Sequence, residues 1–326
     1  MKRQLVLSNF LKENLARGIS KVLPKLAWDK KCYRIFEEAG FHITPNHFYY
    51  PIPDTSVLGD NLWEKESELV GLDMNVSEQL RLLQQVFPKF KEEYNFPTAK
   101  NNVSNEHDFY LNNFNFCAGD AEVLHSMIRY FKPKKIVEIG SGFSTYLSAR
   151  AALMNKEKDG VNTELIAVEP FPNDTLKRGF PGLSALIQKP LEQVDLDLFL
   201  SLEANDILFI DSSHVLKIGG DVKYEYLDIL PRLGSGVIIH SHDIFFPCEY
   251  PKNWALDNHW FWTEQYLLQA FLAFNSAFEI LWATQYMTRK YLNELKLAFP
   301  SFENISPTDI KVGTAIGSGS LWIKRK

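Results

Sequence analysis

The chain has 326 residues, of which 45% are hydrophobic and 23% are charged, and this composition excludes a disordered or collagen-like chain. Its 35 basic and 40 acidic residues give a formal net charge of −5, which disfavours a nucleic-acid partner. Three widely spaced cysteines, Cys32, Cys117 and Cys248, predict no disulfide framework and no CxxC metal site, and they favour a reducing, cytoplasmic compartment.

The N-terminal residues predict an amphipathic helix rather than a signal peptide or a membrane span. The apolar run Leu5–Leu7 is too short for either, and polar residues interrupt it from Ser8 onward. From Leu7 to Val22 apolar residues recur at helical spacing, and Pro24 ends the pattern. We expect this helix to pack on the protein, with a helix lying on a membrane surface as the alternative.

Residues 1–110 show no alternation of strands and helices, and we expect a helical N-terminal extension there. A helix is predicted from Trp28 to Ala39, closed by Gly40. Prolines between His42 and Asp54 exclude a regular helix, and the aromatic residues beside them predict an extended, ordered segment shielded from water. Another helix begins at Asn75 or Ser77, and its buried face uses Leu80, Leu83, Val86 and Phe87.

From about residue 111 to the end, short apolar runs alternate with helical patterns. Strands are predicted at 136–139, 165–169, 184–188, 207–211, 236–240, 278–284 and 320–324. Helices are predicted at 121–131, 145–154, 191–202, 220–233 and 262–274. Continuous β-branched runs of this kind are typical of a parallel sheet covered on both faces, so we predict an α/β domain over 111–326.

Ligands of such sheets bind beyond the carboxyl ends of the strands, so the residues at those ends are the candidates for a site. They are Gly140, Ser141 and Gly142 after the first strand, Glu169 at the second, Asp211 and His214 at the fourth, and His242 and Asp243 at the fifth. His240 falls inside the fifth strand and is predicted to be a core histidine whose polar atoms are satisfied by hydrogen bonds.

The glycine loop and Glu169 predict a site for a nucleoside-containing ligand. Gly140 and Gly142 let the backbone turn tightly and approach a ligand closely. Thr145 stands where a dinucleotide fingerprint has its third glycine, which disfavours a hydride-transfer enzyme. Glu169, at the end of the second strand, can accept hydrogen bonds from both hydroxyls of a ribose.

Glu138–Gly142 resembles the E-x-G-x-G loop of class I S-adenosylmethionine (SAM)-dependent methyltransferases. Residues 48–53 and 240–268 are similar to segments of a narrower family of small-molecule enzymes, known simply by their methyltransferase domain. The resemblance implies SAM as cofactor. It also implies a Rossmann-like sheet of seven strands, mostly parallel, with the last strand antiparallel and inserted beside the fifth.

The resemblance also implies roles for individual residues toward SAM. Glu138, Gly140, Ser141 and Gly142 would surround its methionine part, and Glu169 would hold its ribose. Gln188 would lie near the adenine. Asp120 would lie near the amino-acid moiety, or would instead cap the helix that follows it. Asp211 would meet the SAM amino group or order its own loop.

A second resemblance concerns the ends of strands four and five. In the metal-dependent macrocin-type O-methyltransferases, acids at these ends bind a divalent ion, and Asp211, His214 and Asp243 match their spacing. The implied metal ligands are Asp211, His242 and Asp243. Because His242 stands where those enzymes usually have a carboxylate, Mn²⁺, Fe²⁺ or Zn²⁺ are candidates beside Mg²⁺. Methyl transfer at this site without any metal is the alternative.

The predicted function is SAM-dependent O-methylation of a small molecule that carries a hydroxyl group. Asp211 and His214 are the predicted catalytic residues, with His214 as general base because imidazole titrates near neutrality. Tyr49, Tyr50, Phe245 and Trp262 are predicted to contact the acceptor. The alternative is a SAM-binding protein without catalysis, acting as a sensor or partner. A homo-oligomer stays open.

Overall fold

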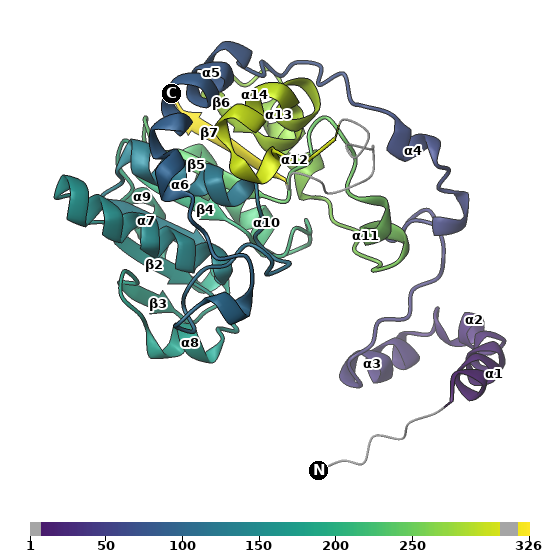
Figure 1. Ribbon diagram of the computed structural model, residues 1–326. Helices are drawn as coiled ribbons and strands as arrows, with labels where there is room; N and C mark the ends of the chain where they lie inside the picture. Colours follow the sequence, from purple (N-terminus) through teal and green to yellow (C-terminus); the bar gives the residue numbers. More distant parts are fainter. Residues whose placement is uncertain (1–7, 307–318) are drawn as a thin grey trace. The chain divides into compact units, whose positions relative to one another are not determined.

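A computed structural model describes residues 8–306 and 319–326 (Figure 1). The run Leu5–Leu7 lies outside these residues. The chain divides between Gly59 and Asp60 into two compact units. No helix in the described part of the chain is long and apolar enough to cross a membrane.

The N-terminal unit consists of short helices. They are α1 (Asn9–Ser20), α2 (Leu23–Leu26), α3 (Lys30–Glu38) and the 3₁₀ turn η1 (Thr55–Val57). Ser8 begins α1 because its hydroxyl accepts a hydrogen bond from the Leu11 amide. No residue of α1 is buried among the described residues of this unit, so the predicted apolar stripe is not part of a core there. The expected shielding of the aromatic segment is wrong within this unit, because Phe48 and Tyr49 are each 82% exposed.

The second unit is built on a seven-stranded sheet in the order β3-β2-β1-β4-β5-β7-β6. Its strands are β1 (Lys135–Ile139), β2 (Glu164–Val168), β3 (Ala185–Ile187), β4 (Ile207–Ile210), β5 (Ile238–His242), β6 (Phe278–Ala283) and β7 (Ser320–Arg325). The first five strands pair in parallel, and β7 runs antiparallel between β5 and β6. The predicted α/β class and the antiparallel last strand beside the fifth are confirmed.

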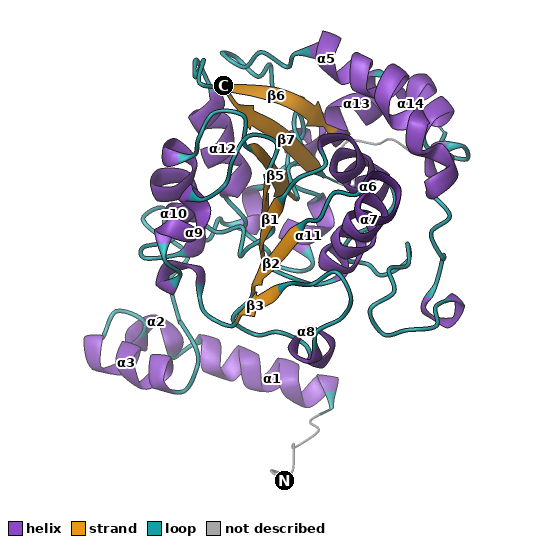
Figure 2. Ribbon diagram, turned by 90° about the vertical axis from the view of Figure 1, so that its left-hand side faces the viewer, coloured by secondary structure: helices purple, strands orange, loops and turns teal. Residues whose placement is uncertain are grey.

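Helices cover both faces of this sheet, which Figure 2 shows nearly edge-on. On one face lie α5 (Val76–Arg81), α6 (Asp120–Phe131), α7 (Phe143–Asp159), α13 (Thr284–Lys290) and α14 (Leu292–Ala298), and on the other lie α9 (Leu196–Leu200), α10 (Asp221–Tyr224) and α12 (Glu264–Leu272). Successive strand side chains alternate between the faces, so Ile136 joins the first core and Val137 joins the second. This burial on both sides explains the continuous apolar runs.

Two predicted helices change type where the sequence has a proline. The helix from Val76 continues as a π turn η2 (Leu82–Val86) and a 3₁₀ turn η3 (Phe87–Glu93), with Pro88 in the first turn of η3. The helix after Gly220 likewise continues as η6 (Glu225–Ile229) and η7 (Leu230–Arg232), with Pro231 in the first turn of η7. Proline has no N–H to donate to the carbonyl four residues earlier, so the α-helical ladder cannot run through it.

The remaining elements are short connections between the sheet layers. They are α4 (Asn61–Glu64), η4 (Lys100–Asn102), α8 (Asp174–Arg178), η5 (Leu191–Gln193), α11 (Lys252–Leu256) and η8 (Pro300–Phe302). Residues 60–110 pack in the second unit, where Phe87 lies 5.1 Å from the Trp282 ring and 5.5 Å from the Phe299 ring. A functional boundary at residue 110 stays a prediction.

Candidate active site

A cavity of about 470 Å³ opens at the carboxyl ends of β1, β2, β4 and β5. Its lining contains the glycine loop at one end and the acidic and histidine side chains of β4 and β5 at the other. These predicted residues are Gly140, Ser141, Gly142, Glu169, Asp211, His214, His242, Asp243, Phe245 and Trp262. The strands are parallel, so their ends meet at one edge of the sheet and bring together residues far apart in sequence.

The glycine loop lies directly against the end of β4. Gly140 has a φ of +76°, and a Cβ at this position would lie 1.7 Å from the carbonyl oxygen of Asp211. Only glycine fits this turn, because any side chain would collide with backbone. The Gly142 amide donates a hydrogen bond to the Thr145 hydroxyl (2.9 Å), which fixes the loop to the first turn of α7.

The two glutamates expected near SAM occupy different positions. Glu138 is fully buried beneath the loop, where its Oε1 accepts hydrogen bonds from Ser144 (2.5 Å) and Thr145 (3.0 Å). Its Oε2 has no partner among the described residues, and burial raises its pKa to about 8. Glu169 lines the cavity, and its Oε2 accepts a hydrogen bond from the Ser141 amide (3.2 Å).

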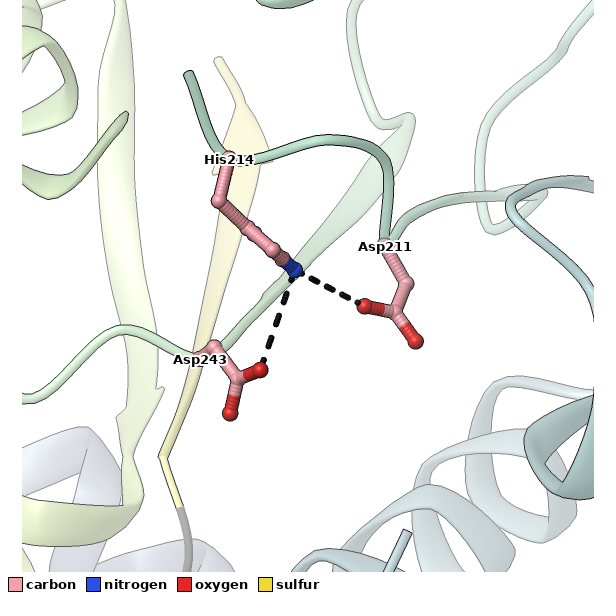
Figure 3. Close-up of side chains that lie close together, drawn as sticks. All are labelled: Asp211, His214 and Asp243. Atoms are coloured by element: carbon pink, nitrogen blue, oxygen red, sulfur yellow. Dashed lines mark ion pairs between the residues drawn. The ribbon is translucent and has the colours of Figure 1, made fainter. Parts of the chain in front are cut away.

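Asp211, His214 and Asp243 converge at the other end of the cavity (Figure 3). The His214 Nε2 lies 3.3 Å from Asp211 Oδ1 and 3.7 Å from Asp243 Oδ2. One potential ligand atom from each residue lies within 4.8 Å of the others. His214 and Asp243 both have positive φ values (59° and 54°), an uncommon conformation for non-glycine residues that turns both loops sharply at the site.

A buried carboxylate that the sequence analysis missed holds His214 from behind. The His214 Nδ1 lies 2.8 Å from Oε2 of Glu264, which is fully buried, and the hydroxyl of Tyr226 donates to the other carboxylate oxygen (2.7 Å). The amides of Thr263 and Glu264 donate to the His214 carbonyl (2.9 and 3.1 Å). The start of α12 therefore fixes both the ring and the backbone of His214, and leaves Nε2 facing the two aspartates.

The electrostatics of this cluster favour a protonated imidazole. Burial alone would lower the pKa of His214, but hydrogen bonds to Asp211 and Glu264 raise it well above its usual value. Burial raises the pKa of Asp211, but the charge of His242 and the hydrogen bond from His214 bring it below its usual value. His214 therefore carries a proton between two carboxylates, and a cation bound there would displace it.

His242 lines the cavity but lies outside the group of three. Its Nδ1 is 3.7 Å from Asp120 Oδ2, and its Nε2 is 3.6 Å from Asp243 Oδ1. The ring of Phe116 lies 4.9 Å away. Asp211, His214 and Asp243 thus form a group that could hold a metal ion, and the expected set, with His242 in place of His214, stays a prediction.

Asp120 is a buried structural anchor and not a helix cap. The N-cap of α6 is Gly119, so the capping alternative for Asp120 is wrong. Its carboxylate instead accepts hydrogen bonds from Ser320 (2.7 Å), Thr284 (3.0 Å) and the Gly319 amide (3.1 Å). Burial raises its pKa to about 6. These bonds tie α6 to the ends of β6 and β7 beside His242.

His240 is buried in the core, as the sequence predicts, but the expectation that its polar atoms are satisfied is wrong, because neither ring nitrogen has a hydrogen-bond partner among the described residues. It is fully buried, with its ring stacked 4.6 Å from Trp322 and 4.1 Å from the ring of Phe209. Burial lowers its pKa well below the usual value, so it stays neutral.

Aromatic side chains wall the cavity beside His214. The Trp262 ring lies 4.3 Å from the His214 ring, and Trp260 stacks on Trp262 at 5.2 Å with 5° between the planes. Trp254 packs edge-on against Trp262 (5.0 Å) and against Phe245 (5.3 Å). Phe245 and Trp262 were expected here, whereas Trp254 and Trp260 were not singled out.

Three predicted residues of the second unit, Glu138, Asp120 and Gln188, are not among the described residues that line the cavity. Gln188 is exposed just beyond β3. Tyr49 and Tyr50 belong to the N-terminal unit, so a contact with the acceptor stays a prediction. Conversely, residues 114–117 line the cavity although no motif marks them. They precede α6, and only the fold brings them beside β4 and β5.

Comparison with known proteins agrees with this geometry. Residues 137–244 match the family described as "Methyltransferase domain". A curated relative from Archaeoglobus fulgidus, named "Uncharacterized protein", is 34% identical over 178 residues, which are 52% of this chain and 78% of the relative. The segment of residues 137–244, which holds most of the site residues, is thus similar to the methyltransferase domain family.

A solved structure from Thermobifida fusca YX, described as "a putative methyltransferase", is also similar. The match covers 64% of this chain and 80% of that one, at 13% sequence identity and a TM-score of 0.33.

Proposed function

We propose that this methyltransferase-domain protein uses SAM to methylate a hydroxyl oxygen of a small molecule. The observation that carries the proposal is the single cavity that joins the glycine loop and Glu169 to the cluster of Asp211, His214 and Asp243. The first end suits a nucleoside-containing donor, and the second suits activation of an acceptor.

The residues at the β1 and β2 ends fit SAM. Gly140 leaves no side chain between the loop and the cavity, and Ser141 and Glu169 face the same space. When bound, SAM supplies an electrophilic methyl group. The chain's contribution is to hold donor and acceptor in line, an alignment that can remove several kcal/mol from the barrier.

The cluster of Asp211, His214 and Asp243 fits a divalent cation. Two carboxylates and one imidazole favour Mn²⁺ or Fe²⁺ and also admit Mg²⁺. Such an ion, when bound, would lower the pKa of an acceptor hydroxyl. Glu264 orients the imidazole of His214 in either case. Without a cation, His214 must first release the proton on Nε2 before it can act as a general base.

The acceptor half of the cavity is walled by Phe245, Trp254, Trp260 and Trp262. Flat aromatic rings beside the carboxylates of Asp211 and Asp243 favour a small acceptor with an apolar face and a nearby hydroxyl group.

The test is methyl transfer from labelled SAM to a panel of hydroxylated small molecules, with Mn²⁺, with Mg²⁺ and with chelator. Turnover is expected with a cation and is expected to vanish in Asp243→Asn, while S-adenosylhomocysteine binding measured by calorimetry persists. Asp174→Asn, whose side chain is 84% exposed and lies outside the cavity lining, serves as a matched control with unchanged turnover. Failure of wild type to bind either SAM or S-adenosylhomocysteine would refute the proposal.

One observation favours the alternative, a SAM-binding protein without catalysis. The His214 Nε2 is paired with both aspartates, so no free base faces the acceptor space until a cation displaces its proton. SAM binding without turnover under every cation and acceptor tested would select this alternative.

A further inference from the structure

The helix α1 presents an apolar stripe that its own unit leaves exposed. Leu11, Leu15 and Ile19 are four residues apart and lie on one side of α1, and Val22 follows three residues later in the turn between α1 and α2. Their exposed fractions are 50%, 53%, 44% and 52%. A continuous apolar stripe of this kind marks a surface that binds a partner.

The same helix and its continuation are basic. Between residues 9 and 26 the charged residues are Lys12, Arg17, Lys21 and Lys25 against one acid, Glu13. The whole N-terminal unit, residues 1–59, has nine basic and five acidic residues, whereas residues 60–326 have 26 basic and 35 acidic ones. The charge of the chain is therefore segregated, with an excess of positive charge in the unit that exposes the stripe.

Aromatic residues stand at both ends of this segment. Phe10 is 76% exposed in the first turn of α1, and Trp28 is 61% exposed just before α3. Large apolar side chains on one face and basic side chains on the other are typical of helices that lie in the headgroup region of a bilayer.

We propose that the N-terminal unit binds the surface of an anionic lipid bilayer through α1. Leu11, Leu15, Ile19 and Val22 enter the headgroup region, and the lysines and Arg17 contact lipid phosphates. Charge complementarity favours anionic lipid over a second copy of the chain as the partner of this stripe. A second copy of the unit would bring two basic helices together, where like charges repel, whereas anionic lipids neutralise them. The proposal is independent of the methyltransferase assignment.

The test is co-sedimentation of the full-length chain with vesicles of phosphatidylcholine, alone or with about 30% phosphatidylglycerol. Binding is expected only to the anionic vesicles, and it is expected to weaken strongly between about 0.05 M and about 0.5 M salt because screening shortens the reach of the basic residues. Absence of binding to anionic vesicles at low salt overturns the proposal.

Variants distinguish vesicle binding through the apolar stripe from nonspecific binding by other exposed apolar residues. Leu15→Glu removes an inserting side chain and adds a repelled charge, so vesicle affinity is expected to fall about thirtyfold. The matched control is Leu297→Glu on α14, where the leucine is 77% exposed, and vesicle binding should stay unchanged. Lys12→Ser with Lys21→Ser should reduce the salt dependence as well as the affinity.

Two further outcomes would overturn the proposal. One is binding to anionic vesicles that Leu15→Glu leaves intact. The other is a dimer in vesicle-free solution that Leu15→Glu dissociates, which would identify the stripe as an interface between copies. An unchanged far-ultraviolet circular dichroism spectrum in every variant shows that the chain is still folded.

Discussion

Replacing Glu264 by glutamine tests whether the buried carboxylate positions His214 for cation binding. The change keeps the shape of the side chain and removes its charge. In the structure Glu264 bonds the imidazole at Nδ1 (2.8 Å) and accepts a hydrogen bond from Tyr226 (2.7 Å), and it is fully buried. A glutamine can keep only one of these two contacts as an acceptor of hydrogen bonds, because its amide nitrogen is a donor.

The size of the effect follows from this geometry. A hydrogen bond to a charged group contributes about 1.5–3 kcal/mol, against about 0.5–1.5 kcal/mol between neutral groups. The difference, about 1.4 kcal/mol, is a factor of about ten in affinity. Carboxylates behind metal-binding histidines have effects of about 10- to 100-fold on metal affinity. We therefore expect Glu264→Gln to weaken Mn²⁺ binding between about tenfold and about 100-fold.

The assay is calorimetric titration of Mn²⁺ into protein saturated with S-adenosylhomocysteine. Tyr226→Phe is the matched control, because it removes one donor to Glu264 and leaves the carboxylate bonded to His214, so Mn²⁺ affinity should fall less than in Glu264→Gln. S-adenosylhomocysteine affinity reports folding in both variants. Mn²⁺ affinity within about twofold of wild type in Glu264→Gln, with donor binding intact, would refute the reasoning.

Four further predictions concern the same cavity. Gly140→Ala should abolish SAM binding, as measured by calorimetry, and should lower the thermal unfolding midpoint, because its Cβ would collide with the Asp211 carbonyl; Gly142→Ala should leave that midpoint near the wild-type value, because no described atom lies within 4 Å of a Cβ there. Mn²⁺ affinity should rise about tenfold per pH unit until the pH reaches the raised pKa of His214, since the ion displaces its proton, and a pH-independent affinity would contradict this. The free energy of unfolding of the cation-free protein should instead fall as the pH rises. The raised pKa contributes stability that is fully present below about pH 6.5 and is lost as the pH rises through the folded value, which denaturant unfolding at several pH values can measure. Trp262→Ala should raise the KM for the acceptor by more than tenfold and leave SAM affinity unchanged, because the ring lines the cavity 4.3 Å from His214; equal losses for both ligands would contradict this.

Most of the sheet could be predicted from the sequence because its strands are buried on both faces. Such strands appear as continuous apolar runs, and β1, β2 and β4 lie within about one residue of the predicted ranges. The strand ends then had to meet at one edge, which places Glu169, Asp211 and Asp243 around one cavity. The helices were less predictable, since Pro88 and Pro231 change the type of helix without ending it.

The sequence placed His242 with Asp211 and Asp243, whereas the structure groups His214 with them, and the reason is geometric. His240, Ser241 and His242 alternate along β5, so His240 and His242 point to the face where Phe116 packs, and Ser241 points to the face of Tyr226. His242 is thereby directed between Asp120 and Asp243, at 3.7 Å and 3.6 Å, and it lies outside the group of Asp211, His214 and Asp243. His214 reaches Asp243 because its loop turns back at positive φ, a conformation that no pattern in the sequence indicates.

Glu264 escaped prediction because nothing local distinguishes it. It is the first residue of a helix, where an acidic residue is ordinarily explained by the helix dipole. Its partner His214 lies 50 residues earlier, and only the packing of α12 against the second face of the sheet brings them together. The exposed aromatic residues Phe48 and Tyr49 show the opposite error, in which burial was expected from hydrophobicity alone.

The strand order explains why a donor and an acceptor would meet at one point. In the order β2-β1-β4-β5, the glycine loop of β1 is the neighbour of Asp211 at the end of β4, and Gly140 approaches the Asp211 carbonyl more closely than any other residue type could. The residues suited to SAM lie on the β1 and β2 side of this contact, and the residues suited to a cation and an acceptor lie on the β4 and β5 side. A side chain at residue 140 would separate the two halves. The contact of Gly140 with Asp211 therefore matters for the alignment of the reactants as well as for folding, because catalysis by alignment tolerates displacements of only about 1 Å.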